Sequence, residues 1–250
     1  MITLGVDFGG SGIKGCPVDV TIGEMVNERF RLPTPEKARP KDVAEVIGEI
    51  AQHFEWKGPI GIGFPAVIRN GIAYSAANIH KSWIGTNAVD LFHQATNCPT
   101  YVLNDADAAG IAEMRFGVGK ERSAGVVIVL TLGTGIGSAI FVDGILVPNT
   151  EFGHLVIRGK DAEARAGDAA RQRDGLTWEE YAVRLTEYLN EMEKLFSPEL
   201  FIISGGVSKS WEKYFPLLKI HTPILPARFL NRAGIIGAAM YAAEKDSARK

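Results

Sequence analysis

Residues 4–15 read LGVDFGGSGIKG, an apolar run that ends in an acid and a glycine-rich turn before the strand pattern resumes. This pattern predicts a strand over residues 2–8, a turn at residues 9–12 and a second strand over residues 13–20. A hairpin with a glycine tip therefore opens the fold. A further extended segment is predicted over residues 25–32.

The second half of the chain repeats this order of elements. A strongly apolar strand is predicted over residues 125–132, a glycine turn at residues 133–135 and a second strand over residues 136–142. Strand, glycine turn and strand thus occur twice. The repetition indicates an internal duplication and an α/β protein made of two related lobes.

The position of this repeat sets the expected domain boundaries. We expect a small N-terminal α/β lobe over residues 1–103 and a larger C-terminal α/β lobe over residues 104–234. A C-terminal helix, about residues 235–250, is expected to return to the first lobe.

Two helices have capping-box spacing at their predicted starts. Asp42 with Glu45 precedes the apolar periodicity of residues 41–55, and Thr177 with Glu180 precedes a longer periodic stretch. We expect both helices to pack an apolar face on a sheet.

Composition excludes several classes of protein. Of 250 residues, 46% are apolar, and 27 Lys and Arg against 29 Asp and Glu leave a net charge of -2, so we expect neither a nucleic-acid nor a membrane partner. Glycines interrupt the longest apolar run, residues 124–140, which argues against a membrane span. With no secretory leader and only Cys16 and Cys98, we expect a cytoplasmic protein without disulfides.

Three glycine turns, each after an apolar strand, are candidate phosphate-binding sites. Backbone N–H groups without side chains in front of them can converge on phosphate oxygens, although a single such turn can equally be a tight hairpin. The sequence contains no G-x-x-x-x-G-K-[ST] motif, which would indicate a phosphate-binding loop of the P-loop type. The candidate phosphate- or nucleotide-binding residues are Asp7, Gly9, Gly10, Ser11, Gly12, Lys14, Thr131, Gly133, Thr134, Gly135, Gly205 and Gly206.

Two charged residues of the first hairpin have specific expected roles. Asp7, at the end of the strand, is placed to hold Mg²⁺ directly or through water, because Mg²⁺ prefers oxygen ligands and keeps several waters. Lys14 would add positive charge at the phosphates; the alternative is a solvated strand lysine.

Longer motifs carry a family resemblance. LGVDFGGSGIKG, LTLGTGIGSAIFVDG at 130–144 and ISGGVSK at 203–209 resemble the two phosphate motifs and the adenosine motif of actin-like, hexokinase-type sugar kinases. NDADAA at 104–109 and EFGH at 151–154 resemble the catalytic and sugar-binding signatures of the ROK family. SAANIHKSWIG and VPNTEFGHL are most similar to its polyphosphate-dependent glucokinases.

This resemblance implies a fold and a reaction. The fold would be the actin-like ATPase (ribonuclease H-like) fold, with two lobes and a central cleft. The reaction would transfer the terminal phosphoryl group of inorganic polyphosphate or ATP to the 6-hydroxyl of glucose, or of mannose, with Mg²⁺. The family likeness also implies a homodimer.

The resemblance further assigns roles to single residues. Asp105 would be the catalytic base, with a plain helix cap as the alternative. His154 has a structural histidine as its alternative, and Glu163 a solvated helical acid. The expected sugar-binding residues are Asn78, Asn104, Asp105, Glu151, His154 and Glu163.

One departure from the broader family concerns zinc. Many ROK proteins carry a cysteine-rich zinc module after this Glu-x-Gly-His motif, whereas residues 155–170 contain no cysteine, so we predict no zinc. The mixed charges there are expected to form a solvated helix face, or alternatively to line a path for a phosphate polymer.

Two alternative functions stay open at this point: a strictly ATP-dependent ROK hexokinase for another hexose, and a non-catalytic sugar-binding actin-like protein. A ROK-type repressor would need a DNA-reading module, and Ile2 already begins the first strand.

Overall fold

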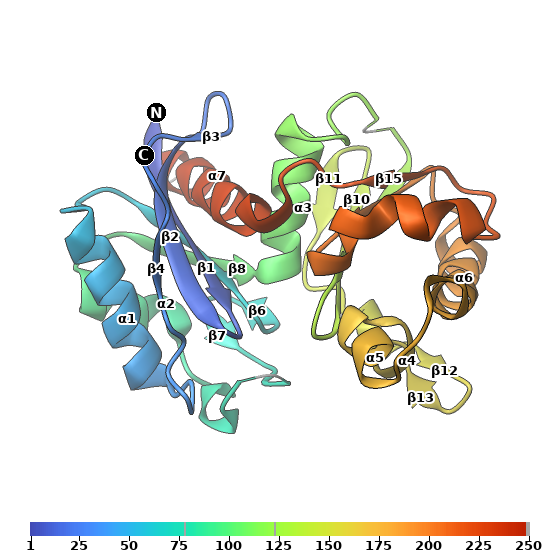
Figure 1. Ribbon diagram of the computed structural model, residues 1–250. Coiled ribbons are helices and arrows are strands. Elements are labelled where there is room, and N and C mark those ends of the chain that lie inside the picture. The colour runs from blue at the N-terminus through green and yellow to red at the C-terminus, as the bar shows by residue number, and fades with distance from the viewer. Residues whose placement is uncertain (78, 123, 249–250) are drawn as a thin grey trace. The chain divides into compact units, whose positions relative to one another are not determined.

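The chain forms two compact units in the computed structural model, which describes residues 1–77, 79–122 and 124–248 (Figure 1). Unit 1 comprises Met1–Ala112 and Arg232–Lys250, and unit 2 comprises Glu113–Asn231. Unit 2 is therefore inserted into the sequence of unit 1. The first boundary falls within helix α3 (Asp105–Phe116) and not at the expected residue 103.

Unit 1 is built on a mixed sheet with the strand order β3-β2-β1-β5-β8. β1 (Ile2–Gly9) pairs antiparallel with β2 (Gly12–Asp19), as the predicted hairpin requires. On its other side β1 is parallel to β5 (Ile60–Phe64), which is parallel to β8 (Thr100–Asn104). The expected strand over residues 25–32 is instead two short strands, β3 (Glu24–Met25) and β4 (Phe30–Leu32), which both pair with β2.

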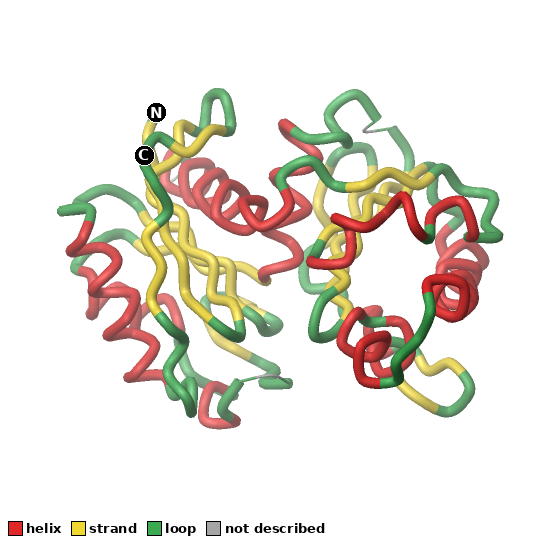
Figure 2. The backbone as a smooth tube through the Cα atoms, viewed as in Figure 1, coloured by secondary structure: helices red, strands yellow, loops and turns green. Residues whose placement is uncertain are grey.

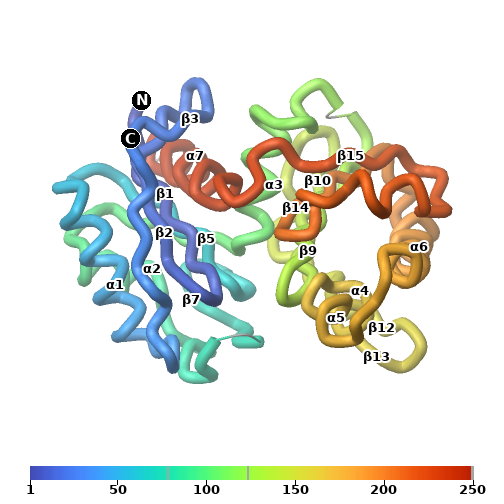
Figure 3. Tube along the Cα trace, in the orientation of Figure 1, coloured from blue at the N-terminus to red at the C-terminus, as the bar shows by residue number. Residues whose placement is uncertain are grey.

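Helices cover both faces of this sheet (Figure 2). On one face lies α1 (Pro40–His53), next to α2 (Ala88–Thr96). On the other face lies α7 (Ala233–Ser247), which approaches so closely that a Cβ on Gly61 would lie 1.8 Å from the Ala238 carbonyl oxygen. The C-terminal helix thus completes the core of unit 1, and both chain ends belong to this unit (Figure 3).

Smaller elements join these strands and helices. They are β6 (Ile68–Arg69), β7 (Ile72–Ala73) and the short helix η1 (Lys81–Trp83).

Unit 2 contains a second sheet of the same topology, with the order β11-β10-β9-β14-β15. β9 (Val126–Leu132) and β10 (Ile136–Val142) form the hairpin, β11 (Ile145–Val147) extends it, and β14 (Leu200–Ser204) and β15 (Ile224–Pro226) lie parallel on the other side of β9. The duplication predicted from the sequence is confirmed by this shared strand order.

Helix α6 (Trp178–Phe196) supplies the main apolar face that packs on this sheet, with Tyr181, Leu185 and Leu189 fully buried. Between β11 and α6 lie η2 (Phe152–His154), β12 (Val156–Ile157), β13 (Lys160–Asp161), α4 (Glu163–Ala166) and α5 (Asp168–Arg173). After β14 come η3 (Gly206–Lys213), η4 (Phe215–Leu217) and η5 (Leu230–Arg232).

The two predicted capping boxes have different outcomes. The box of α6 is confirmed, because Thr177 Oγ1 accepts from the N–H of Glu180 while the Glu180 carboxylate accepts from the N–H of Thr177. The box at Asp42 is wrong. Helix α1 begins at Pro40, whose fixed φ suits the first helical position, and Arg39 is the N-cap.

Within residues 1–77, 79–122 and 124–248, no helix combines the length and the apolar character needed to cross a bilayer.

Candidate active site

Two carboxylates of unit 1 lie at the carboxyl edge of its parallel strands. Asp7 near the end of β1 is in register with Gly63 of β5, which is in register with Leu103 of β8; Asp105 follows as the first residue of α3. With neighbouring strands about 4.8 Å apart, the backbones at Asp7 and Leu103 are about 10 Å apart. Gly63 puts no side chain between them. Ligands of α/β sheets bind at this edge.

Asn104 caps α3. Its Oδ1 accepts from the N–H groups of Ala106 (2.8 Å) and Asp107 (3.1 Å), and its Nδ2 donates to the Ala66 carbonyl oxygen. The side chain is buried, so its polar atoms mainly hold the start of the helix. Asp105, the alternative cap, remains partly exposed beside it.

Asp7 is paired with Lys14 across the hairpin. The Lys14 ammonium lies 3.2 Å from Asp7 Oδ2, and both side chains are 20% exposed. The alternative of a solvated strand lysine is therefore wrong. On its other side Asp7 meets the start of α7, where a Cβ on Gly234 would lie 2.9 Å from Oδ1.

This setting bears on the expected magnesium site. Asp7 offers a hard oxygen donor, but Lys14 already places positive charge at Oδ2. The carboxylate therefore fits Mg²⁺ held through an intervening water better than direct ligation.

Neither packing nor backbone conformation accounts for two of the turn glycines. A Cβ on Gly10 or on Gly133 would meet no atom within 4 Å, and neither residue has a positive φ. The backbone at both positions is therefore open to close approach. Gly12 differs, because a Cβ would lie 2.5 Å from Arg31, whose guanidinium donates to the Ser11 carbonyl oxygen.

The turn of the third motif has a conformational requirement. Gly205, which follows β14, has a φ of 87°, and a Cβ would lie 2.3 Å from the Leu132 carbonyl oxygen. The backbone at Gly205 therefore lies directly against the end of β9, where a side chain has no room. Gly206 lies next to Asp168, at the start of α5, whose Ala169 N–H donates to the Gly133 carbonyl oxygen.

Glu163 is held against the second glycine turn. Its Oε2 accepts from the Ile136 N–H at 3.3 Å. A Cβ added to Gly135 would lie 2.2 Å from Glu163 Oε2, and a Cβ added to Gly153 would lie 3.3 Å from the same oxygen. Both glycines therefore leave room for the carboxylate. The alternative of a solvated helical acid is therefore wrong.

His154 is oriented by an acid that the sequence-based site did not include. Its Nδ1 lies 2.9 Å from Asp161 Oδ2 in a half-exposed pair. This hydrogen bond raises the pKa of His154, while burial raises the pKa of Glu151. With Nδ1–H donating to Asp161, the neutral imidazole presents Nε2 as an acceptor.

The segment before His154 is tied to the sheet by a buried hydroxyl. Ser138 Oγ donates to the Thr150 carbonyl oxygen and accepts from the Phe152 N–H, at 2.9 and 3.0 Å. These bonds flank Glu151 on both sides and fix its backbone.

One set of possible metal ligands lies in the same place. Donor atoms of His154, Asp161 and Glu163 all lie within 4.8 Å of one another. Imidazole with two carboxylates lacks the thiolates of cysteine-rich zinc modules, and Nδ1 of His154 is already bonded to Asp161. The absence of zinc stays a prediction.

The structure thus collects the predicted residues in two groups. Unit 1 brings Asp7, Lys14, the tip Gly9–Gly12, Asn104 and Asp105 to one end of its sheet. Unit 2 groups the remaining described candidates around its own turns: Thr131, Gly133, Thr134, Gly135, Glu151, His154, Glu163, Gly205 and Gly206. Asn78 lies outside the described residues.

Three residues near these groups were not predicted as site residues: Arg31, Ser138 and Asp161. Arg31 and Asp161 contact partners in separate segments, so no local motif marks them. Ser138 lies within the quoted motif at residues 130–144, but its partners Thr150 and Phe152 lie outside that motif. The only local signal for Asp161 is its place in the cysteine-free stretch after His154.

Comparison with known proteins gives consistent matches. The model of the ROK family matches residues 3–169. A polyphosphate glucokinase of Mycobacterium tuberculosis is 47% identical over 238 residues, which is 95% of this chain and 89% of the relative.

Solved structures of similar proteins also match this chain over nearly its full length. Inorganic polyphosphate/ATP-glucomannokinase from Arthrobacter sp. strain KM superposes with a TM-score of 0.94 at 48% identity, covering 98% of this chain and 99% of that one. A ROK family glucokinase from Streptomyces griseus, in complex with glucose and AMPPNP, has a TM-score of 0.82 at 24% identity, over 98% of this chain and 100% of that one, which is a likeness of fold.

Proposed function

Because the chain belongs to the ROK family, we propose that it is a kinase that transfers the terminal phosphoryl group of inorganic polyphosphate or ATP to the 6-hydroxyl of glucose. Support comes from relatives similar over nearly the full chain and from the carboxylates and glycine turns described above. We include mannose as a second acceptor, on the similarity to a glucomannokinase.

Asp105 is the general base in this proposal. It accepts the proton of the 6-hydroxyl as that oxygen bonds to the terminal phosphorus, while the bond from phosphorus to the bridging oxygen breaks and the shortened chain leaves. Asn104 and the helix start fix the position of the carboxylate, and its partial exposure allows a hydroxyl to reach it. This placement at the carboxyl edge of β8 is the observation that carries the proposal.

Three of the proposed sugar-binding residues, Glu151, His154 and Glu163, belong to unit 2. Glu151 and Glu163 accept from sugar hydroxyls, and His154 accepts through Nε2 because Asp161 occupies Nδ1. A sugar lacking one of these hydroxyls would leave a polar group unpaired, which is how such a site discriminates among hexoses.

The glycine turns hold the phosphoryl donor. Backbone N–H groups of these turns, other than that of Gly133, which donates to the Gly135 carbonyl oxygen, offset negative charge on the phosphates together with Lys14. Asp7 would hold Mg²⁺ through water, and the ion would supply further positive charge at the phosphate oxygens of the donor.

Replacement of the base tests the proposal. In Asp105→Asn we expect kcat with glucose to fall about 10²- to 10⁴-fold, the usual contribution of a general base, with a smaller change in glucose affinity. The matched control is Asp42→Asn, which removes a carboxylate from the first turn of α1. Undiminished phosphorylation by Asp105→Asn would contradict the assignment of the base. A wild type that phosphorylates no hexose would instead favour the non-catalytic alternative.

An assay matrix separates the remaining alternatives. Glucose, mannose and other hexoses are each supplied with polyphosphate and with ATP in the presence of Mg²⁺. Turnover with ATP alone would support the strictly ATP-dependent hexokinase instead. The proposal further includes a cytoplasmic homodimer, tested by cell fractionation and by light scattering of the purified protein.

A further inference from the structure

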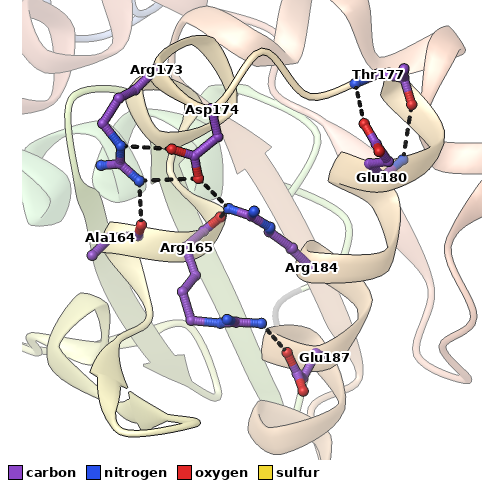
Figure 4. Close-up of polar contacts among 8 residues, drawn as sticks. All are labelled: Ala164, Arg165, Arg173, Asp174, Thr177, Glu180, Arg184 and Glu187. Carbon is purple, nitrogen blue, oxygen red and sulfur yellow. Dashed lines mark hydrogen bonds and ion pairs between the residues drawn. The ribbon is translucent and has the colours of Figure 1, made fainter.

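Unit 2 contains a basic pocket beside α4. The cavity has a volume of about 380 Å³ and is lined by Lys160, Ala164, Arg165, Arg173, Asp174 and Arg184. Figure 4 shows the polar contacts of these residues other than Lys160. Four of these six side chains are cationic and one is acidic. We call this cavity the α4 pocket.

Carboxylates do not neutralise the α4 pocket. Asp174 receives hydrogen bonds from Arg173 and Arg184, which lower its pKa to about 2, and Glu187 receives them from Arg158 and Arg165. Two ionised carboxylates thus face four arginines and Lys160, which leaves three positive charges in excess.

Nearby acids are engaged elsewhere. Glu163 accepts from Ile136, Asp161 pairs with His154, Asp168 pairs with Arg171, and Glu180 caps α6.

The guanidinium groups are already held in position. Arg173 Nη2 donates to the Ala164 carbonyl oxygen at 2.9 Å, and Arg184 Nη1 donates to the Arg165 carbonyl oxygen. These bonds cap the end of α4 and also fix the orientation of the cations before any ligand binds. A preorganised guanidinium loses less side-chain entropy when it binds a phosphate.

Donors remain available in the pocket. Within the described part of the chain, nothing accepts from Arg173 Nη1, Arg184 Nη2 or the Lys160 ammonium. Capping of α4 accounts for two of the cations but not for Lys160, which makes no side-chain bond to the described residues. Converging N–H donors with excess positive charge are suited to phosphate oxygens.

Helix α5 links this pocket to the glycine turns of the same unit. Its first turn is bonded to the Gly133 carbonyl oxygen and lies next to Gly206, while its last residue is Arg173. Six helical residues span about 9 Å. A linear phosphate chain that leaves the turns along α5 therefore reaches the α4 pocket within a few phosphate units.

We propose that the α4 pocket binds the distal part of a linear inorganic polyphosphate while its terminal phosphate reacts at the glycine turns. This rests on the proposed use of polyphosphate as donor. ATP and tripolyphosphate are too short to occupy both places, so the pocket favours long chains selectively.

Removal of two pocket cations tests the proposal. In Lys160→Ala/Arg173→Ala we expect KM for long-chain polyphosphate to rise roughly three- to tenfold, as loss of partly exposed charge contacts would give. KM for ATP, tripolyphosphate and glucose should stay within twofold. The KM for long chains should also become less sensitive to added salt. Lys160→Ala alone should show a smaller rise in this KM. Because this substitution breaks no side-chain bond to the described residues, it replaces the double variant if that variant folds poorly.

The matched control is Lys194→Ala/Lys219→Ala, which removes two exposed lysines of unit 2 outside the pocket. An unchanged KM for long chains, or a rise equal to that of the control, would overturn the α4 pocket while leaving the kinase intact. If the KM for ATP rose as much as the KM for long chains, the cations would only stabilise α4 and would not bind the distal part of polyphosphate. If the wild type does not use polyphosphate at all, the donor assignment fails, and the pocket proposal fails with it.

Discussion

At the scale of single residues, Asp161 determines how His154 presents its imidazole. The pair raises the pKa of His154, so its stabilising contribution is fully present below the unfolded pKa, about 6.5, and is lost as the pH rises through the folded pKa. Asp161→Asn keeps an acceptor for Nδ1–H but removes the charge. We expect the pKa of His154 to fall and the pH dependence of the glucose KM to move to lower pH.

NMR titration of the imidazole resonances measures this shift, with His221 as the internal control because it lies outside the cluster. A His154 pKa that is the same in the wild type and in Asp161→Asn would show that the pair has no such role.

Gly10 allows a test of ligand approach at the first turn. Since a Cβ there meets no protein atom and φ is not positive, Gly10→Ala should leave stability unchanged or raise it by about 0.5 kcal/mol. KM for polyphosphate and for ATP should rise, about tenfold, because the added methyl group faces the donor. Gly58→Ala, whose Cβ would make only ordinary contacts with Trp56, is the control. Equal donor KM values in the two variants would contradict a phosphate site at this turn.

Sequence alone predicted the residues whose role is local. Asp7, Asp105 and the turn glycines could be named as candidates because each stands at or just after the end of an apolar strand, and their roles stay predictions. Asp161 and Arg31 were not, because their contacts depend on which distant segments pair.

At the scale of elements, the reciprocal cap of α6 makes a defined contribution to unit 2. Thr177→Ala removes the acceptor for the Glu180 N–H and should lower the free energy of unfolding by about 1 kcal/mol, or roughly 2 to 4 °C in Tm. Thr177→Asp keeps a capping oxygen and should behave nearly as the wild type. Calorimetry of both variants checks this, and equal losses would show that the hydroxyl bond contributes nothing.

The elements also show where local patterns fail. The cap of α6 was predictable because both of its bonds join residues three apart. The start of α1 was not, because Pro40 fixes the first turn before Asp42 is reached. The segment 25–32 breaks into two strands because Asn27, Glu28 and Arg29 between them are exposed and do not continue the pairing with β2.

At the scale of the whole molecule, the two units have separate cores, and α7 belongs to the core of unit 1. Gly61→Ala would place a methyl group 1.8 Å from the backbone of α7 and should loosen that helix from the sheet. Hydrogen exchange should accelerate in β1, β5 and β8 and stay unchanged in β9 and β14. Gly58→Ala again serves as the control. Equal acceleration in both sheets would mean that the units unfold together.

The duplicated strand order was predictable because hydrophobic runs and glycine turns recur in both halves. The boundary between the units was not, because α3 is one continuous helix whose first part packs on α7: a Cβ on Gly237 would lie 1.7 Å from the Ala108 carbonyl oxygen. Because α3 continues across the boundary without a break, the sequence carries no local signal of where one unit ends and the next begins.

The late position of α7 in the sequence has a consequence for biosynthesis. Unit 2 is contiguous and is complete in the nascent chain before Arg232 is translated, whereas the sheet of unit 1 lacks one of its covering helices until Ala233–Ser247 has been made. The strands of unit 1 therefore keep apolar surface open to chaperones while the inserted unit folds, and the half that carries Asp105 is completed after it.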